Sequence, residues 1–172
     1  IEDKASQQLQ HLLKRAIQTQ LSDQPPEPVG VFLSGGLDSA ITAALLAHTG
    51  VKVRAYTLDF GAYGNSEIPF AEQVAEYLSI PLTKVDASPE RIKGALLATA
   101  QALDAPFGDG VTIPLYLLNQ AARNDCAVVF NGEGGDQLFG GWTNKPLIAA
   151  DVYQPTHPAA TDFAQEYLRT FH

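Results

Sequence analysis

Apolar residues along the chain follow two periods, one typical of helices and one typical of short buried strands. Residues 5–21 carry leucine, isoleucine and alanine three or four positions apart, which predicts an amphipathic helix that ends in the proline-rich segment 22–28. Beyond this segment, apolar and β-branched runs predict strands at 29–33, 51–59, 82–86 and 127–131. Helical spacing fills the intervals at 39–48, 67–78, 89–103 and 114–123, and returns weakly at 162–171.

Strands that alternate with helices in this way predict an α/β fold with a doubly wound, mostly parallel sheet. The runs at 29–33 and 127–130 are continuously apolar, as strands covered on both faces need to be. Ligands bind such sheets beyond the carboxyl ends of the strands. We therefore expect a functional site in the segments that leave these ends, at 34–39, 60–66 and 132–141.

The length of 172 residues corresponds to about one domain. We expect a lead helix and linker at 1–28, a main domain at 29–145 and a helical extension at 146–172. The chain begins at Ile1 and contains no methionine, so we also expect a truncated extension and a recorded sequence that is part of a longer protein.

The chain is acidic, since 11 lysines and arginines against 19 aspartates and glutamates give a net charge of −8. A chain without a cationic field does not attract phosphate backbones, so we expect no nucleic-acid partner. No apolar run approaches the roughly 20 residues of a membrane span, and the single cysteine, Cys126, excludes an intrachain disulfide. These features favour a cytoplasmic protein without a membrane partner.

The first candidate site is the turn between the strand at 29–33 and the following helix. Gly35 and Gly36 allow a ligand to approach the backbone closely, and a helix start attracts anions. The motif lacks the lysine of a mononucleotide P-loop and does not fit G-x-G-x-x-G. The run from Ser34 to Ser39 resembles the pyrophosphate loop of the ATP pyrophosphatases, which implies that its serines and glycines bind the phosphates of ATP. The alternative is a plain turn in which Ser34 or Asp38 caps the helix.

A second glycine-rich motif follows the last predicted strand. Residues 132–141 resemble the G-E-G-x-D-E-x-F-G-G signature of the asparagine synthetase family, and depart from it at Gln137, where the family usually has glutamate. Together with the first motif, this resemblance implies a PP-loop fold of the adenine nucleotide alpha hydrolase-like type. The matching residues are Gly132, Glu133, Gly134, Asp136, Leu138, Phe139, Gly140 and Gly141.

The same resemblance implies roles for the carboxylates. Asp38 and Asp136 would bind Mg²⁺ together, and two carboxylates on one ion suit a hard cation. Such an ion also explains why a carboxylate is tolerated beside phosphate oxygens. Glu133 would act as an acid, a base or an orienting group near the substrate, although it also fits a solvated loop carboxylate.

Further residues match the family less specifically. Asp109, Thr112 and Gly134 are implied to line an amino-acid pocket, whereas a turn and a helix cap explain Asp109 and Thr112 equally well. The backbone groups of Leu58, in the second strand, and Gly132 are implied to contact adenine.

The resemblance covers residues 27–145 and implies ATP- and Mg²⁺-dependent adenylation of the aspartate side chain, followed by amide formation with ammonia. A glutaminase domain or subunit and a homodimer are the partners it suggests. Two alternatives remain. One is another carboxylate-adenylating enzyme, such as a β-lactam synthetase; the other is an ATP-binding or regulatory module without catalysis.

Overall fold

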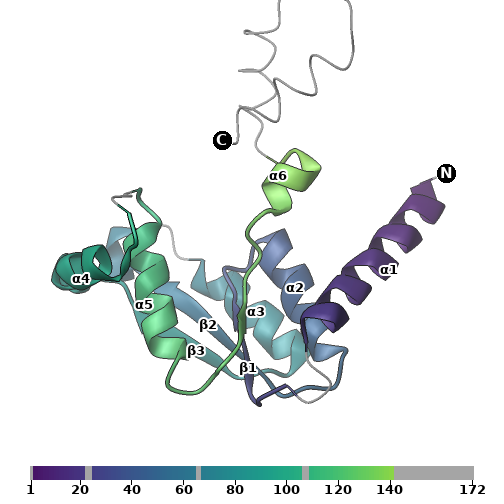
Figure 1. The fold of residues 1–172 in the computed structure, drawn as a ribbon, viewed down its shortest axis with the longest axis horizontal. Coiled ribbons are helices and arrows are strands. Elements are labelled where there is room, and N and C mark those ends of the chain that lie inside the picture. Colours follow the sequence, from purple (N-terminus) through teal and green to yellow (C-terminus); the bar gives the residue numbers. More distant parts are fainter. Residues whose placement is uncertain (1, 22–24, 65–66, 106–108, 142–172) are drawn as a thin grey trace, which may run out of the picture. The chain divides into compact units, whose positions relative to one another are not determined.

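The structure is a computed structural model that describes residues 2–21, 25–64, 67–105 and 109–141 (Figure 1). The chain divides into two compact units, Ile1–Gly132 and Glu133–His172. The predicted main domain at 29–145 therefore extends over parts of both units.

The first unit is built on a parallel sheet of four strands in the order β3-β2-β1-β4. Each pair of neighbouring strands runs in the same direction, so helices or long connections must cross the sheet between them. The four predicted strands are all present, with the last one shortened to two residues. They are β1 (Val29–Phe32), β2 (Val53–Asp59), β3 (Leu82–Asp86) and β4 (Val129–Phe130).

Helices cover both faces of this sheet (Figure 1). Helices α1, α2 and α3 lie on one face, and α5, with α4 beside it, lies on the other. Each predicted helix of the first unit is present, with ends moved by up to three residues. They are α1 (Glu2–Gln20), α2 (Leu37–Ala47), α3 (Ile68–Leu78), α4 (Pro89–Ala102) and α5 (Thr112–Ala122). The short 3₁₀ helix η1 (Gly61–Tyr63), which follows β2, was not predicted.

Two apolar clusters, one on each face of the sheet, explain why the strands are apolar at consecutive positions. Val31 and Ala55 belong to the cluster under α2 and α3. Phe32 and Tyr56, the next residue of each strand, belong to the cluster under α5. Because successive side chains of a strand point to opposite faces, a continuous apolar run supplies both clusters. The predicted doubly wound parallel sheet is confirmed.

Helix α1 packs on the core over less of its length than its periodicity predicted. Ile17 near its end is buried in the first cluster. Leu9 and Leu12 are 39% and 51% exposed. These two leucines share the helical spacing of Ile17 but stay exposed, because periodicity identifies an apolar face but not how far its neighbours extend.

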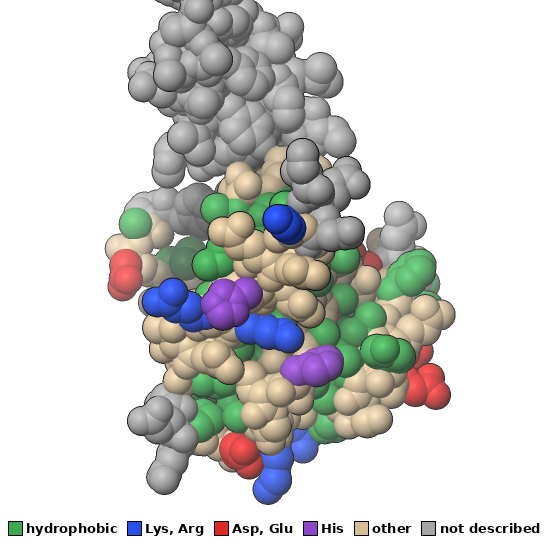
Figure 2. Space-filling model, turned by 90° about the vertical axis from the view of Figure 1, so that its right-hand side faces the viewer, with side chains coloured by type: hydrophobic (Ala, Val, Ile, Leu, Met, Phe, Trp, Pro, Cys, Tyr) green, Lys and Arg blue, Asp and Glu red, His purple; other side chains and the backbone are tan. Residues whose placement is uncertain are grey.

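The outer surface of α1 is basic although the chain is acidic. Lys4, His11, Lys14 and Arg15 are exposed along it, and the face shown in Figure 2 carries more blue and purple side chains than red ones. Within the described part of the chain, no helix is both long enough and apolar enough to cross a membrane.

The second unit contains a helix that the sequence did not predict. Its glycine-rich segment forms α6 (Gly135–Phe139), between Gly134 and Gly140, which both have a positive φ. The predicted helix at 162–171 lies outside the described residues.

Candidate functional site

The first glycine-rich loop leaves the carboxyl end of β1, which lies between β2 and β4. Gly35 has φ +84°, a left-handed conformation that favours glycine. Gly36 is extended and immediately precedes the first residue of α2, Leu37. The first amide groups of a helix have no partner within the helix, and the dipole is positive there. The loop therefore brings an anion-attracting helix start to the carboxyl edge of the sheet.

The two serines of this loop hold it in shape through their hydroxyl groups. Ser39 is buried, and its Oγ accepts a hydrogen bond from the backbone N–H of Ser34 at 3.2 Å and donates one to the Gly36 carbonyl at 3.0 Å. The two hydroxyl oxygens are 3.1 Å apart. Ser34 Oγ also accepts from the Gly36 N–H at 3.2 Å. Hydrogen bonds from the two serines thus hold the loop closed around its glycines without a ligand.

Neighbouring backbone leaves no room for a side chain at Gly35. A Cβ atom there would lie 2.5 Å from Phe70 Cβ and 2.7 Å from the Ala71 nitrogen, at the start of α3. The loop is therefore supported from α3. The sequence did not point to Phe70, because nothing in an isolated helical pattern shows which residue meets a loop 35 positions earlier.

A second close approach joins the exit of β4 to the start of α2. A Cβ atom at Gly132 would lie 2.8 Å from the Ser39 nitrogen and 2.9 Å from the Asp38 carbonyl carbon. The structure thus brings Gly132 to the first loop, although 93 positions separate it from Ser39. Parallel pairing of β1 with β4 places their carboxyl ends side by side.

Leu58 lies within β2 and Gly132 follows β4, and these two strands flank β1. Leu58 lies near the end of β2 and packs partly buried on the second apolar cluster. Because the sheet order is β2-β1-β4, these two residues lie on opposite sides of the Ser34–Ser39 loop. Their predicted contact with adenine stays a prediction.

Asp38 is half-buried in the first turn of α2, where the helix dipole favours a negative charge. Its backbone carbonyl accepts a hydrogen bond from Thr42 Oγ1 at 2.9 Å. No side-chain hydrogen bond caps α2, so the structure does not support the alternative that Asp38 or Ser34 serves as a helix cap.

Asp109 lies in the turn that leads into α5, two residues before its N-cap, Val111. Its Oδ1 accepts hydrogen bonds from the backbone N–H of Val111 at 2.9 Å, the N–H of Thr112 at 2.8 Å and the Thr112 hydroxyl at 2.7 Å. The side-chain bond from Thr112, followed by the backbone bonds, lowers the pKa of Asp109. The turn that explained Asp109 is thus present, whereas Thr112, the predicted cap, is the first residue of α5 and donates its hydroxyl to Asp109. A role of Asp109 and Thr112 in substrate binding stays a prediction.

The remaining predicted site residues belong to the second unit. Glu133 is exposed, and Gly134 has φ +99° before α6. Asp136 lies in the first turn of α6, and Gly141 donates its backbone N–H to the Asp136 carbonyl at 3.1 Å. A Cβ atom on Gly141 would overlap the Asp136 carboxylate, so this glycine leaves space for that side chain. The convergence of Asp136 with Asp38 stays a prediction.

The described residues were also searched for a metal centre made of protein side chains alone. No group of three or more histidine, cysteine, aspartate or glutamate side chains gathers among them. Mg²⁺ is usually bound through one or two carboxylates together with substrate phosphates and waters. Asp38, half-buried beside the anion-attracting loop, is a carboxylate of the kind that such an ion uses, and the predicted Mg²⁺ site of Asp38 and Asp136 stays a prediction.

Comparison with known proteins shows one matching family. Residues 8–170 match the asparagine synthase family. Asparagine synthetase [glutamine-hydrolyzing] 1 of Bacillus subtilis (strain 168) is 34% identical over 122 residues, which are 70% of this chain and 19% of that protein. A putative asparagine synthetase [glutamine-hydrolyzing] of Mycobacterium bovis is 37% identical over 121 residues, or 69% of this chain and 19% of that protein. The chain thus spans about a fifth of the length of these relatives.

Solved structures agree with the fold. The NH3-dependent NAD synthetase of Campylobacter jejuni superposes with a TM-score of 0.54 over 79% of this chain and 60% of that chain, at 18% sequence identity. Identity this low supports the fold alone. The predicted PP-loop type of α/β fold is confirmed.

Proposed function

The chain belongs to the asparagine synthase family, and from this premise we propose that it forms the ATP-binding synthetase part of an asparagine synthetase-like ligase. The observation that carries the proposal is the Ser34–Ser39 loop, closed by its two serines at the carboxyl end of β1 and joined there by Gly132. An anion belongs at such a helix start, and the pyrophosphate of ATP is the anion that the motif resemblance names.

The proposed reaction has two steps. A side-chain carboxylate oxygen of aspartate attacks the α-phosphorus of ATP, which forms a carboxyl–AMP bond and releases pyrophosphate. Ammonia then attacks the activated carbonyl carbon, the bond to AMP breaks, and the ammonium nitrogen loses a proton as the amide forms. The amide groups at the start of α2 oppose the negative charge that grows on the leaving pyrophosphate.

The motif resemblance supplies the roles of the individual residues in this proposal. Asp38 and Asp136 would bind Mg²⁺, which supplies positive charge to the phosphate oxygens. The backbone at Leu58 and Gly132 would contact adenine from the two sides of the loop. Glu133 would exchange a proton with the attacking nitrogen or orient it. Gly134, Asp109 and Thr112 would border the amino acid.

An assay with the 172-residue chain tests this function. The chain is incubated with ATP, Mg²⁺, aspartate and ammonia, and pyrophosphate, AMP and asparagine are measured. We expect pyrophosphate release that depends on aspartate, with asparagine appearing only when ammonia is added. Pyrophosphate release that depends on a carboxylate other than aspartate would indicate a different adenylating enzyme. Binding of ATP without turnover would indicate a binding module and contradict the catalytic proposal for this chain.

Calorimetry tests the metal assignment apart from turnover. Asp38→Asn should weaken binding of Mg·ATP by about tenfold or more, equivalent to about 1.4 kcal/mol, and should weaken metal-free ATP less. Glu76→Gln, which removes a charge from the exposed side of α3, is the control and should change neither. Equal affinity of Asp38→Asn and the unmodified chain for Mg·ATP would refute the assignment.

The ammonia source, the assembly state and the compartment belong to the same proposal. A glutaminase domain or subunit is the source that fits relatives described as glutamine-hydrolyzing. A homodimer and a cytoplasmic location stay predictions, and sedimentation of the purified chain would test the first of them.

A further inference from the structure

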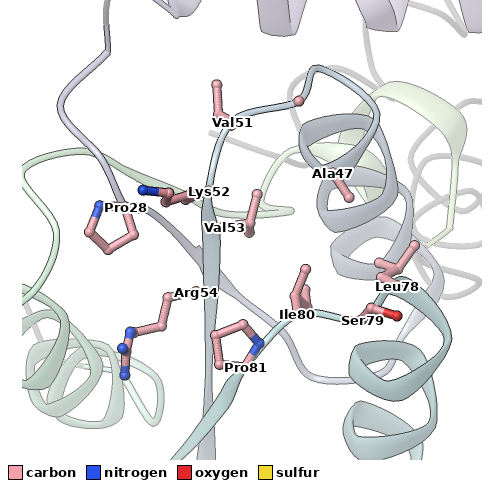
Figure 3. A pocket seen from close by; sticks show the side chains of 11 residues that line it. Pro28, Ala47, Val51, Lys52, Val53, Arg54, Leu78, Ser79, Ile80 and Pro81 are labelled. Atoms are coloured by element: carbon pink, nitrogen blue, oxygen red, sulfur yellow. The ribbon is translucent and has the colours of Figure 1, made fainter.

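Helices α1, α2 and α3 form one layer on the sheet, with α2 between the other two (Figure 1). Figure 3 shows the ends of α2 and α3 side by side, where Ala47 and Leu78 border the same pocket. We call the outer surface of this layer the three-helix face. Large apolar side chains that gather across neighbouring helices mark a contact surface, whereas single ones are ordinary. Those exposed on α2 and α3 are Leu37, Ile41, Phe70 and Tyr77.

The exposed side chains of the outer two helices point away from the core. Successive residues of a helix are about 100° apart around its axis. Arg15 therefore lies about 160° around α1 from the buried Ile17. Tyr77, which is 88% exposed, lies about 160° around α3 from the buried Ala75. The three-helix face thus presents a cation on one outer helix and an aromatic ring on the other.

These two outer helices also differ in charge. Residues 4–20 of α1 contain three basic residues and no acidic one, whereas α3 contains two glutamates and no basic residue. One of these glutamates, Glu72, pairs with Lys84 at 2.6 Å. The other, Glu76, is exposed and, like Arg15, forms no ion pair within the residues that the structure describes. The face is therefore cationic at the α1 side (Figure 2) and acidic at the α3 side.

We propose that two copies of this chain pair through the three-helix face, about a two-fold axis that runs along α2. Turning a second copy over about this axis exchanges the two sides of the face, so α1 of each copy lies on α3 of the other. Arg15 of each copy then lies near Glu76 and Tyr77 of the other, and arginine is attracted both to carboxylates and to aromatic rings. The apolar side chains of the two α2 helices cover each other at the centre, which removes them from water.

Charge decides between this pairing and an alternative about a different axis. Two chains that each carry a net charge of −8 repel each other, so a stable contact needs opposite charges where the chains touch. An axis across the helices would place α1 on α1 and bring like charges together, whereas an axis along α2 pairs a cation with a carboxylate twice. Such a two-fold contact is the commonest kind in homo-oligomers. The pairing uses none of the groups assigned to ATP or Mg²⁺, so it can fail while the proposed synthetase function stands.

Sedimentation equilibrium of the 172-residue chain tests whether the pair forms. We expect the mean mass to rise with concentration from the 18.4 kDa of one chain towards twice that value. Tyr77→Ser, which removes an exposed ring without opening the core, should weaken the dimer at least about tenfold. A mass of one chain up to the solubility limit, or a dimer that Tyr77→Ser leaves unchanged, would overturn the proposal.

Charge reversal then tests which helices meet. Arg15→Glu and Glu76→Arg should each weaken the dimer at least about tenfold, because each variant alone brings like charges together. An equal mixture of the two variants should dimerise again, since the two reversed charges meet at one contact and the two unchanged charges meet at the other. Lys93→Glu, which reverses an exposed cation on α4 beyond the other face of the sheet, is the matched control and should have no effect. Dimers that survive both reversals, or that the mixture does not restore, would refute this pairing.

Discussion

Gly132 lies where two backbone segments pass too closely for any side chain. A methyl group there would meet the Ser39 nitrogen and the Asp38 carbonyl carbon, which are both backbone atoms and cannot rotate away. This contact locates the exit of β4 against the start of α2. At the scale of single residues, the shape of the candidate site thus depends on the glycine at position 132, which has no side chain, as much as on the two serines of the loop.

Gly132→Ala should therefore weaken ATP binding and lower the free energy of unfolding by about 1–3 kcal/mol, a usual cost of overpacking. Urea unfolding and calorimetry measure the two effects. Gly94→Ala in the middle of α4 is the matched control, because an added Cβ there meets nothing within 4 Å. The control should stabilise the protein by about 0.5–1 kcal/mol. If Gly132→Ala and Gly94→Ala changed the ATP affinity and the free energy of unfolding equally, the close contact at Gly132 would not be the cause.

Asp109 allows a test of pH dependence. Its pKa is lowered by the hydrogen bonds from Thr112 and Val111, so the carboxylate stabilises the fold at pH values above its unfolded pKa of about 3.9. This contribution is lost as the pH falls through the lower, folded pKa. Asp109→Ala should be less stable than the unmodified chain at neutral pH, and the difference should shrink under acid conditions.

Denaturant unfolding at a series of pH values measures this difference. Asp104→Ala, which removes an exposed carboxylate from the preceding segment, is the control. If the effect of Asp109→Ala were the same at all pH values, the hydrogen bonds of Asp109 would not stabilise the fold through the charged carboxylate.

At the scale of elements, α1 shows how an amphipathic pattern overstates packing. Leucines at 9 and 12 have the same spacing as Ile17, but only Ile17 is buried against the sheet. A helical period results from any apolar face, whether neighbours cover all of it or only its end. The extent of coverage depends on how α1 lies relative to α2, and the local sequence does not specify that.

A pair of truncations separates the two ends of α1. Ile17→Ala should lower the free energy of unfolding by about 2 kcal/mol, because it leaves a cavity in the core. Leu12→Ala should cost about 0.5 kcal/mol or less, as surface substitutions do. Thermal and urea unfolding measure both. A larger loss for Leu12→Ala than for Ile17→Ala would mean that the exposed half of α1 is covered.

The short elements were harder to predict than the long ones. Strand β4 has two residues where the apolar run suggested five, and α6 forms inside a segment whose glycines suggested a loop. A two-residue strand exists through its pairing with Gly30 and Val31 of β1, and a five-residue helix between two left-handed glycines has no period to detect. The apolar period of a long helix or strand is visible in its own sequence, whereas β4 and α6 form only through contacts with neighbouring segments.

At the scale of the whole molecule, the first unit holds all four strands and both apolar clusters. Tyr56 also ties β2 to the residues before β4, because its hydroxyl donates to Asp125 and lies 3.5 Å from the Cys126 sulfur. Burial, followed by these two contacts, raises the pKa of Tyr56, so the hydroxyl keeps its proton at neutral pH. The sheet and its closing contacts therefore belong to one unit.

We expect a fragment of residues 1–132 to fold without the second unit. It should unfold in one cooperative thermal transition and keep the near-ultraviolet circular dichroism of its buried tyrosine, since packed cores of this kind unfold as a unit. A fragment with helical signal but no cooperative transition would show that residues beyond Gly132 are needed for the core.

The periodicity of the chain and its two glycine-rich motifs were enough to predict the α/β class, the parallel sheet and the family, because strand and helix periods and short-range turn chemistry are local properties. Only the tertiary structure decided the strand order, the contact of Gly132 with Ser39 and the support of Gly35 by Phe70. Each of these depends on atoms brought together from distant positions, and such distances exist only once the chain has packed.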